Sequence, residues 1–178
     1  MAEIDVQTIS EKTIFGLRIT AATKTIIFLI LLFFIPFFLG GPQLLVGSIV
    51  NLLLIFIAVK YRNYYAIIPM LMLPSIATSL RGLIFGPFSI FLVYMIPAIW
   101  LGNFLLIYTI QHIKNQRLSI SIGGILKTIF LFAIAYILIK LGILPTIFFK
   151  AMGIFQLVTV MIAGVCYVGW SKLCTIKR

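Results

Sequence analysis

The sequence predicts an all-α polytopic membrane protein, a bundle of six transmembrane helices with both termini cytoplasmic. Composition is the first reason: 63% of the residues are hydrophobic, 10% are charged and the mean hydropathy is +1.25, which is typical of membrane proteins. The second is a series of apolar runs separated by Gly, Pro and basic residues, and the third is the distribution of charge. We expect a single integral membrane domain, 1–178.

The first span is expected at about 20–39. A short polar segment, 1–11, precedes it, and an amphipathic stretch from Thr13 to Lys24 leads into it. No cleavable signal peptide pattern opens the chain, so the span itself should direct insertion. Gly40-Gly41-Pro42 then predicts a turn.

The second and third spans are expected at about 44–59 and 65–80. Lys60 and Arg62 lie between them together with tyrosines of the kind found at membrane interfaces. Both spans are shorter than the ~20 residues that cross a bilayer comfortably, so they need neighbouring helices.

The fourth span is expected at about 96–112, because Pro97 suits an early helical position. The preceding residues, 82–95, are left open: an outer loop, a helix along the membrane surface, or part of one long kinked helix from Phe88. After the fourth span, 114–124 is the longest polar connection and lacks apolar periodicity.

The last two spans are expected at about 125–143 and 152–170. Gly142 and Pro145 end the first of them, and a basic tail follows the second. The chain shows no convincing internal repeat, so the sequence does not predict an inverted-repeat transporter.

Basic residues set the predicted orientation. With the N-terminus inside, Arg81, Lys140 and Lys150 fall outside, against eleven inner residues. The inner group is Lys12, Arg18, Lys24, Lys60, Arg62, Lys114, Arg117, Lys127, Lys172, Lys177 and Arg178. The positive-inside rule therefore predicts a multi-pass protein of the cell membrane with cytoplasmic termini.

Acidic residues are confined to the start of the chain. Glu3, Asp5 and Glu11 are the three acids, so from Lys12 onward there is no carboxylate side chain. One copy therefore lacks a carboxylate proton relay, a carboxylate-ligated metal site and a paired-acid hydrolase. Catalytic motifs and phosphate loops are absent too, so we expect no enzyme, cofactor or metal. The net charge of +11 is spread between apolar runs, which does not indicate nucleic-acid binding.

Polar side chains on four predicted spans are expected at a similar depth. Ser75 lies six residues before Arg81, Asn103 six after Pro97 and Gln156 six after Lys150, so each is ~9 Å along its helix from the outer end. Asn51 is ~13 Å from the outer end of its span. The predicted substrate-binding set is Gln43, Asn51, Ser75, Ser79, Arg81, Asn103 and Gln156.

Two interpretations of this set stay open. The residues can line an outward-facing pocket for a small polar molecule, neutral or anionic, with Arg81 as its cap. Alternatively, buried Asn, Gln and Ser join neighbouring helices, each worth about 0.6–2 kcal/mol, and need no ligand. Arg81 is then an ordinary interfacial anchor. The shared depth favours the pocket.

Scattered small and amide residues also resemble a known family. They are Gly41-Pro42 with Asn51, Pro74, Gly82 to Pro87, Gly102-Asn103, and Gln156-Leu157 with Gly164. Together with six short helices in 178 residues, they make the chain similar to the S component of an energy-coupling factor (ECF) importer, in an uncharacterised branch. S components are the substrate-binding membrane subunits of these ABC importers.

The resemblance implies capture of a small polar micronutrient, such as a vitamin, from outside in an outer-half pocket. It also implies three partners: membrane lipid, a small-molecule substrate, and a transmembrane coupling protein with two ATPase subunits. The family docks through an Ala-x-x-x-Ala face on the first span. The nearest match here is Ala21-x-x-x-Thr25, with Ala22 beside it and Gly16 one turn earlier.

A different class of function stays open as the alternative. The chain can be a non-transporting membrane scaffold or assembly protein whose buried amides only join helices. A secondary carrier working alone is disfavoured by the missing carboxylates.

Overall fold

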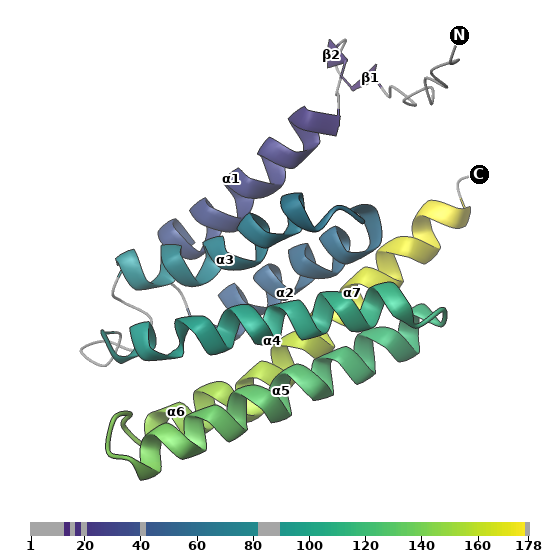
Figure 1. Cartoon of the computed structure of the whole chain (residues 1–178). Helices are drawn as coiled ribbons and strands as arrows, with labels where there is room; N and C mark the ends of the chain where they lie inside the picture. The colour runs from purple at the N-terminus through teal and green to yellow at the C-terminus, as the bar shows by residue number, and fades with distance from the viewer. Residues whose placement is uncertain (1–12, 15–16, 19–20, 40–41, 82–89, 177–178) are drawn as a thin grey trace, which may run out of the picture.

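The fold is an all-helical bundle, as expected (Figure 1). The structure is a computed structural model that describes residues 13–14, 17–18, 21–39, 42–81 and 90–176. Before the first helix, strands β1 (Thr13–Ile14) and β2 (Leu17–Arg18) pair antiparallel. They lie where the sequence predicts an amphipathic entry.

Six long helices and one short helix follow. They are α1 (Ala21–Leu39), α2 (Gln43–Lys60), α3 (Tyr64–Arg81), α4 (Leu92–His112), α5 (Gln116–Lys140), α6 (Ile147–Met152) and α7 (Ile154–Ile176). Helix α1 packs mainly on α3, α2 on α7, and α4 on α5. The long helices alternate in direction along the chain, and α6 lies beside the connection that follows α5 (Figure 1).

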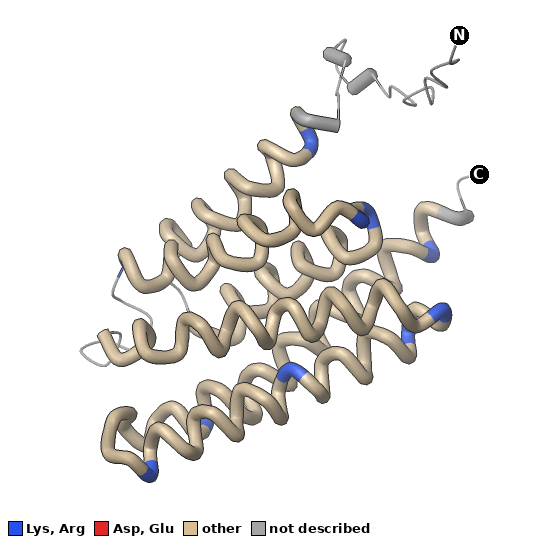
Figure 2. Tube along the Cα trace, in the orientation of Figure 1, with Lys and Arg blue, Asp and Glu red and all other residues tan. Residues whose placement is uncertain are grey.

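The two ends of the bundle differ in charge (Figure 2). One end holds the start of α1, the end of α7 and the connections α2–α3 and α4–α5. Its described basic side chains are Lys24, Lys60, Arg62, Lys114, Arg117 and Lys172. We call it the basic end. The opposite end has Arg81, Lys140 and Lys150.

Four stretches of the described chain are long and apolar enough to cross a membrane. They are Gln43–Lys60, Leu92–His112, Gln116–Lys140 and Ile147–Cys174. Large apolar side chains such as Phe38, Ile129 and Val165 are exposed on the outside of the bundle, where a soluble protein of this size would place polar residues. This is the architecture of a membrane protein.

Helix α5 begins nine residues before the predicted span at 125. Asn115 caps it, with its Oδ1 accepting a hydrogen bond from the Leu118 amide at 3.3 Å. Gly123 and Gly124, at the end of the predicted polar connection, are instead buried helical positions. A Cβ added to Gly124 would lie 2.5 Å from Cγ1 of Val160 on α7. These glycines allow close helix packing, so the predicted polar connection at 114–124 is wrong.

The remaining boundaries need smaller corrections. Helix α4 begins at Leu92 and contains Pro97 in its interior, so the predicted start near 96 is late. The open alternatives for 82–95 fall largely on 82–89, which lie outside the described residues. Helix α5 ends at Lys140, and Gly142 follows with φ of 73°, a left-handed conformation that glycine adopts readily.

Candidate functional site

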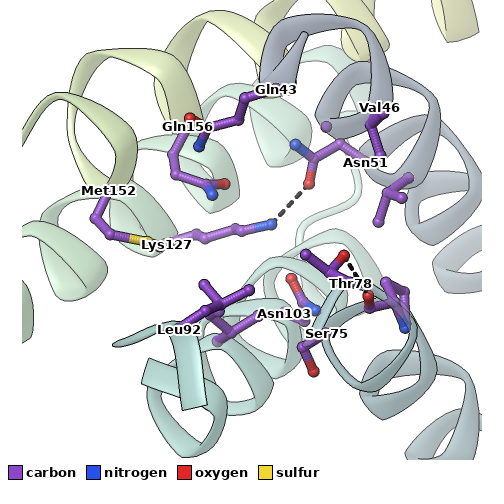
Figure 3. Close-up of a pocket in the computed structure, with 14 residues that line it drawn as sticks. Gln43, Val46, Asn51, Ser75, Thr78, Leu92, Asn103, Lys127, Met152 and Gln156 are labelled. Atoms are coloured by element: carbon purple, nitrogen blue, oxygen red, sulfur yellow. Dashed lines mark hydrogen bonds between the residues drawn. The ribbon is translucent and has the colours of Figure 1, made fainter. Parts of the chain in front are cut away.

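A small cavity lies within the bundle, with a volume of about 100 Å³. Helices α2 to α7 each contribute at least one lining residue. The polar lining residues are Gln43, Asn51, Ser75, Thr78, Asn103, Lys127 and Gln156 (Figure 3). Val46, Leu92 and Met152 form part of the apolar remainder. The cavity is therefore a mixed site with polar groups at several points of an apolar wall.

Five of the predicted site residues meet at this cavity. They are Gln43, Asn51, Ser75, Asn103 and Gln156. The other two, Ser79 and Arg81, are not among its lining residues. Arg81 instead donates a hydrogen bond from Nη1 to the Phe37 carbonyl of α1. Arg81 therefore joins α3 to α1 and does not cap this cavity. Among the described residues, the buried Ser79 hydroxyl finds no hydrogen-bond partner.

Together with Thr78, Lys127 is a polar cavity residue that the predicted site set lacks. It was counted among the inner cationic residues, but it lies eleven residues into α5, which is ~16 Å from the start of the helix. Its side chain is only 3% exposed. Because α5 begins earlier than predicted, Lys127 lies inside the helix and not at its end. It therefore does not belong to the predicted group of eleven inner basic residues. The available signal was a lysine inside an apolar span.

Hydrogen bonds hold Lys127 in place. Its Nζ donates to Oδ1 of Asn51 at 2.7 Å, as Figure 3 shows. Asn51 in turn donates from Nδ2 to Oγ1 of Thr159 at 3.0 Å, and Thr159 donates to the Gln156 carbonyl at 2.9 Å. The chain of bonds connects α5, α2 and α7, so Asn51 has a fixed orientation.

The charge environment of Lys127 is one-sided. No carboxylate side chain occurs from residue 12 onward, so none of the described residues can neutralise an ammonium group here. In the described part of the chain, the bond to Asn51 is the only hydrogen bond of Nζ, whereas an ammonium has three donors. An unpaired charge away from water is costly. A bound anion would supply the opposite charge that the described residues lack.

The wall formed by α3 and α4 is largely bonded to itself. Trp100 donates from Nε1 to Oγ of Ser75 at 2.8 Å, and Ser75 donates to the Met72 carbonyl at 2.8 Å. Asn103 donates from Nδ2 to the Leu71 carbonyl at 3.0 Å. The only donor of the Ser75 hydroxyl is thus used by a protein partner, and Asn103 retains its Oδ1 acceptor.

The wall near the opposite end is formed by two glutamines. Gln43 donates from Nε2 to the Ala151 carbonyl at 2.9 Å, which ties the start of α2 to α6. Among the described residues the Gln156 amide makes no hydrogen bond, and Figure 3 shows it directed toward the same space as Nζ of Lys127. Gln156 is therefore the amide most available to a ligand.

The described members of the predicted docking set, Ala21, Ala22 and Thr25, lie at the basic end. Gly16 is outside the described residues, and Ala21 and Ala22 are the first two residues of α1. Thr25 is half-buried and donates to the Tyr61 hydroxyl at 3.4 Å. Within this chain, Thr25 thus contributes to the contact of α1 with the end of α2.

Metal-ligating residues do not gather in the described part of the chain. No group of three His, Cys, Asp or Glu residues there could hold a metal ion. In comparisons with known proteins, no family model, curated protein or solved structure matches this chain. The cavity and its charge are therefore the features from which a function can be inferred.

Proposed function

We propose that this protein is the substrate-binding membrane subunit of an ECF-type importer, which captures a small polar micronutrient and delivers it with a separate ATPase module. One observation carries the proposal: side chains from helices far apart in sequence converge on one cavity that also holds a buried lysine. Polar and ionisable residues at membrane depth are costly and commonly mark a binding site.

The charge of the two ends supports an outward-facing pocket. Six described basic side chains lie at the basic end and three at the opposite end. In the proposed orientation all six long helices cross the cell membrane, and the basic end is cytoplasmic with both termini. The cavity then opens nearer the outside, because Gln43 and Gln156 lie in the first turns of α2 and α7 at the opposite end.

Transport would require a partner. The chain carries no phosphate loop and no carboxylate relay in its helices, so the energy must come from another protein. The resemblance to S components supplies the kind of partner: a transmembrane coupling protein with two ATPase subunits. The face around Ala21, Ala22 and Thr25 at the cytoplasmic end of α1 would be its docking surface.

The size of the cavity limits the substrate. Its volume of about 100 Å³ is below the ~300–1,000 Å³ of pockets for drug-sized ligands. It is well above the ~10–15 Å³ that one water molecule needs. A compound of a few heavy atoms would fit directly, whereas a vitamin-sized molecule would require the walls to separate.

The test is to identify what the purified protein carries. Mass spectrometry after denaturation should reveal a small polar compound, and adding it back should raise Tm by mass action. Asn103→Leu should abolish the shift while the protein still inserts, because the cavity loses an amide. Asn63→Leu, at the exposed α2–α3 connection, is the control: it removes a cap of α3, whose Tyr65 amide donates to Asn63 Oδ1 at 3.0 Å, so it should lower Tm and keep the ligand-induced shift. Loss of folding in Asn103→Leu with no compound found would count against the proposal.

The scaffold alternative has its own supporting observation. Several cavity residues are already bonded between helices, including Ser75 with Trp100 and Gln43 with α6. Such bonds stabilise membrane bundles without any ligand. A scaffold would copurify with another membrane protein, and recovery of ATPase subunits in a pull-down would argue against it.

A further inference from the structure

We infer that the ligand is a small organic monocarboxylate whose carboxylate pairs with Nζ of Lys127. This rests on the proposed function, because it names the substrate class of the same cavity. The first reason is that Lys127 has no opposite charge beside it in the described chain. Lys127 is 3% exposed and no carboxylate side chain follows residue 12. A bound carboxylate would supply the missing opposite charge through a charge-assisted hydrogen bond.

The donors around Lys127 suit a carboxylate. Nζ keeps two donors beyond its bond to Asn51, and Asn51 keeps one N–H beyond its bond to Thr159. The unbonded Gln156 amide faces the same space (Figure 3). Two carboxylate oxygens have about four lone-pair sites, so these donors can satisfy both oxygens. Thr159 fixes Asn51, which in turn positions Nζ before a ligand arrives.

The charge of the cavity argues for a monoanion. Lys127 is the only cationic residue among its described lining residues, since Arg81, Lys140 and Lys150 lie elsewhere. A phosphate group, with a charge of about −1.5 to −2 at pH 7, would leave negative charge unpaired. One ammonium balances one carboxylate.

The apolar wall argues for an organic group on the carboxylate. Val46, Leu92 and Met152 line the cavity beside the polar residues, and burying apolar surface against them is favourable, at roughly 0.8 kcal/mol per CH₂. The volume of about 100 Å³ limits that group to a few carbon atoms. An inorganic anion such as chloride would leave this wall unused.

The experiment compares isosteres that differ in charge. Tm of the purified full-length protein in detergent is measured with acetate, propionate and lactate, and with the matching acetamide, propionamide and lactamide. Ionic strength is kept constant with the salt of an anion that is too large to enter the cavity, in place of chloride. We expect a carboxylate to raise Tm and its amide not to. Binding should fall by ~30-fold or more in Lys127→Met, since truncating one partner of a buried charge pair is costly.

Controls separate charge from folding. Lys127→Gln keeps a donor for Asn51 and loses the charge, so it should fold and still lose the response. Lys140→Met removes an exposed lysine of the same helix and should respond like the wild type. Equilibrium dialysis with labelled propionate gives a second measure that does not depend on Tm.

The remaining outcomes would overturn different parts of the inference. Equal shifts with carboxylates and amides, or a full response in Lys127→Gln, would overturn the carboxylate inference and leave a binding subunit for neutral compounds. A shift with chloride as large as that with propionate would overturn the organic part. If no carboxylate acts while a neutral compound is released on denaturation, only the inference fails. If nothing binds and nothing is released, the proposed function fails as well.

Discussion

At the scale of single residues, the Lys127–Asn51 contact is a polar pair whose members depend on each other. Both side chains are almost fully buried, with 3% and 2% exposed. Their 2.7 Å hydrogen bond is the only one that Nζ makes within the described chain. Removing one partner leaves the other buried without a hydrogen bond, which lowers the free energy of unfolding. Replacing both by apolar groups can be nearly neutral. The pair therefore behaves as a unit.

Asn51→Leu should lower the free energy of unfolding by about 1–3 kcal/mol, because it leaves a buried ammonium without its acceptor. Adding Lys127→Met to Asn51→Leu should restore most of that loss, since apolar groups of similar size replace both partners. Unfolding in detergent by heat or denaturant measures both variants. A double variant as unstable as the two single effects combined would mean that the residues are not coupled.

At the scale of elements, α5 decides where the site is. It packs against both α4 and α7, and it can approach α7 closely because Gly124 faces Val160. That approach brings Lys127, one turn later, beside Asn51 on α2. The glycine pair thus positions the lysine.

Gly124→Ala should destabilise the protein even though alanine is the better helix former by about 1 kcal/mol. The added Cβ would lie 2.5 Å from Cγ1 of the fully buried Val160, and overpacking costs about 1–3 kcal/mol. Tm should fall, and adding Val160→Ala should restore it. Gly169→Ala is the control, because nothing lies within 4 Å of its added Cβ. Equal Tm values for the two single variants would refute the packing role of Gly124.

The sequence predicts most of the site, and the same helix shows where prediction stops. Helix rise places Asn51, Ser75, Asn103 and Gln156 at a similar depth, because prolines and basic residues locate the outer ends of their helices well enough. Lys127 was missed because 114–124 is polar and lacks apolar periodicity, so the predicted span begins at 125 and places Lys127 near its inner end. In the structure the glycines of that stretch, Gly123 and Gly124, are helical and lie against α4 and α7. Likewise, the bond from Arg81 to Phe37 depends on how α1 meets α3, which no local pattern specifies.

At the scale of the whole molecule, function depends on which end faces outward. The basic end has six described cationic side chains and the opposite end has three. The cavity lies nearer the opposite end. An importer subunit needs that end outside. The proposal therefore makes a prediction about accessibility in cells that is independent of any ligand.

Cys174 is a natural reporter of this orientation. It is exposed, it lies in the last turn of α7, and it follows the basic-end residue Lys172. The other cysteine, Cys166, lies eight residues earlier, ~12 Å deeper along the helix. If Cys166 faces lipid, a membrane-impermeant maleimide will report on Cys174 alone.

Intact cells should leave Cys174 unlabelled by such a maleimide, and permeabilised cells should label it, because the basic end is cytoplasmic under the positive-inside rule. A matched reporter is Lys150→Cys with both native cysteines changed to Ser. Lys150 is exposed on α6, so its replacement should be labelled in intact cells. The reverse pattern would place the mouth of the cavity in the cytoplasm, which excludes capture from outside but leaves the Lys127 site able to bind an anion from within.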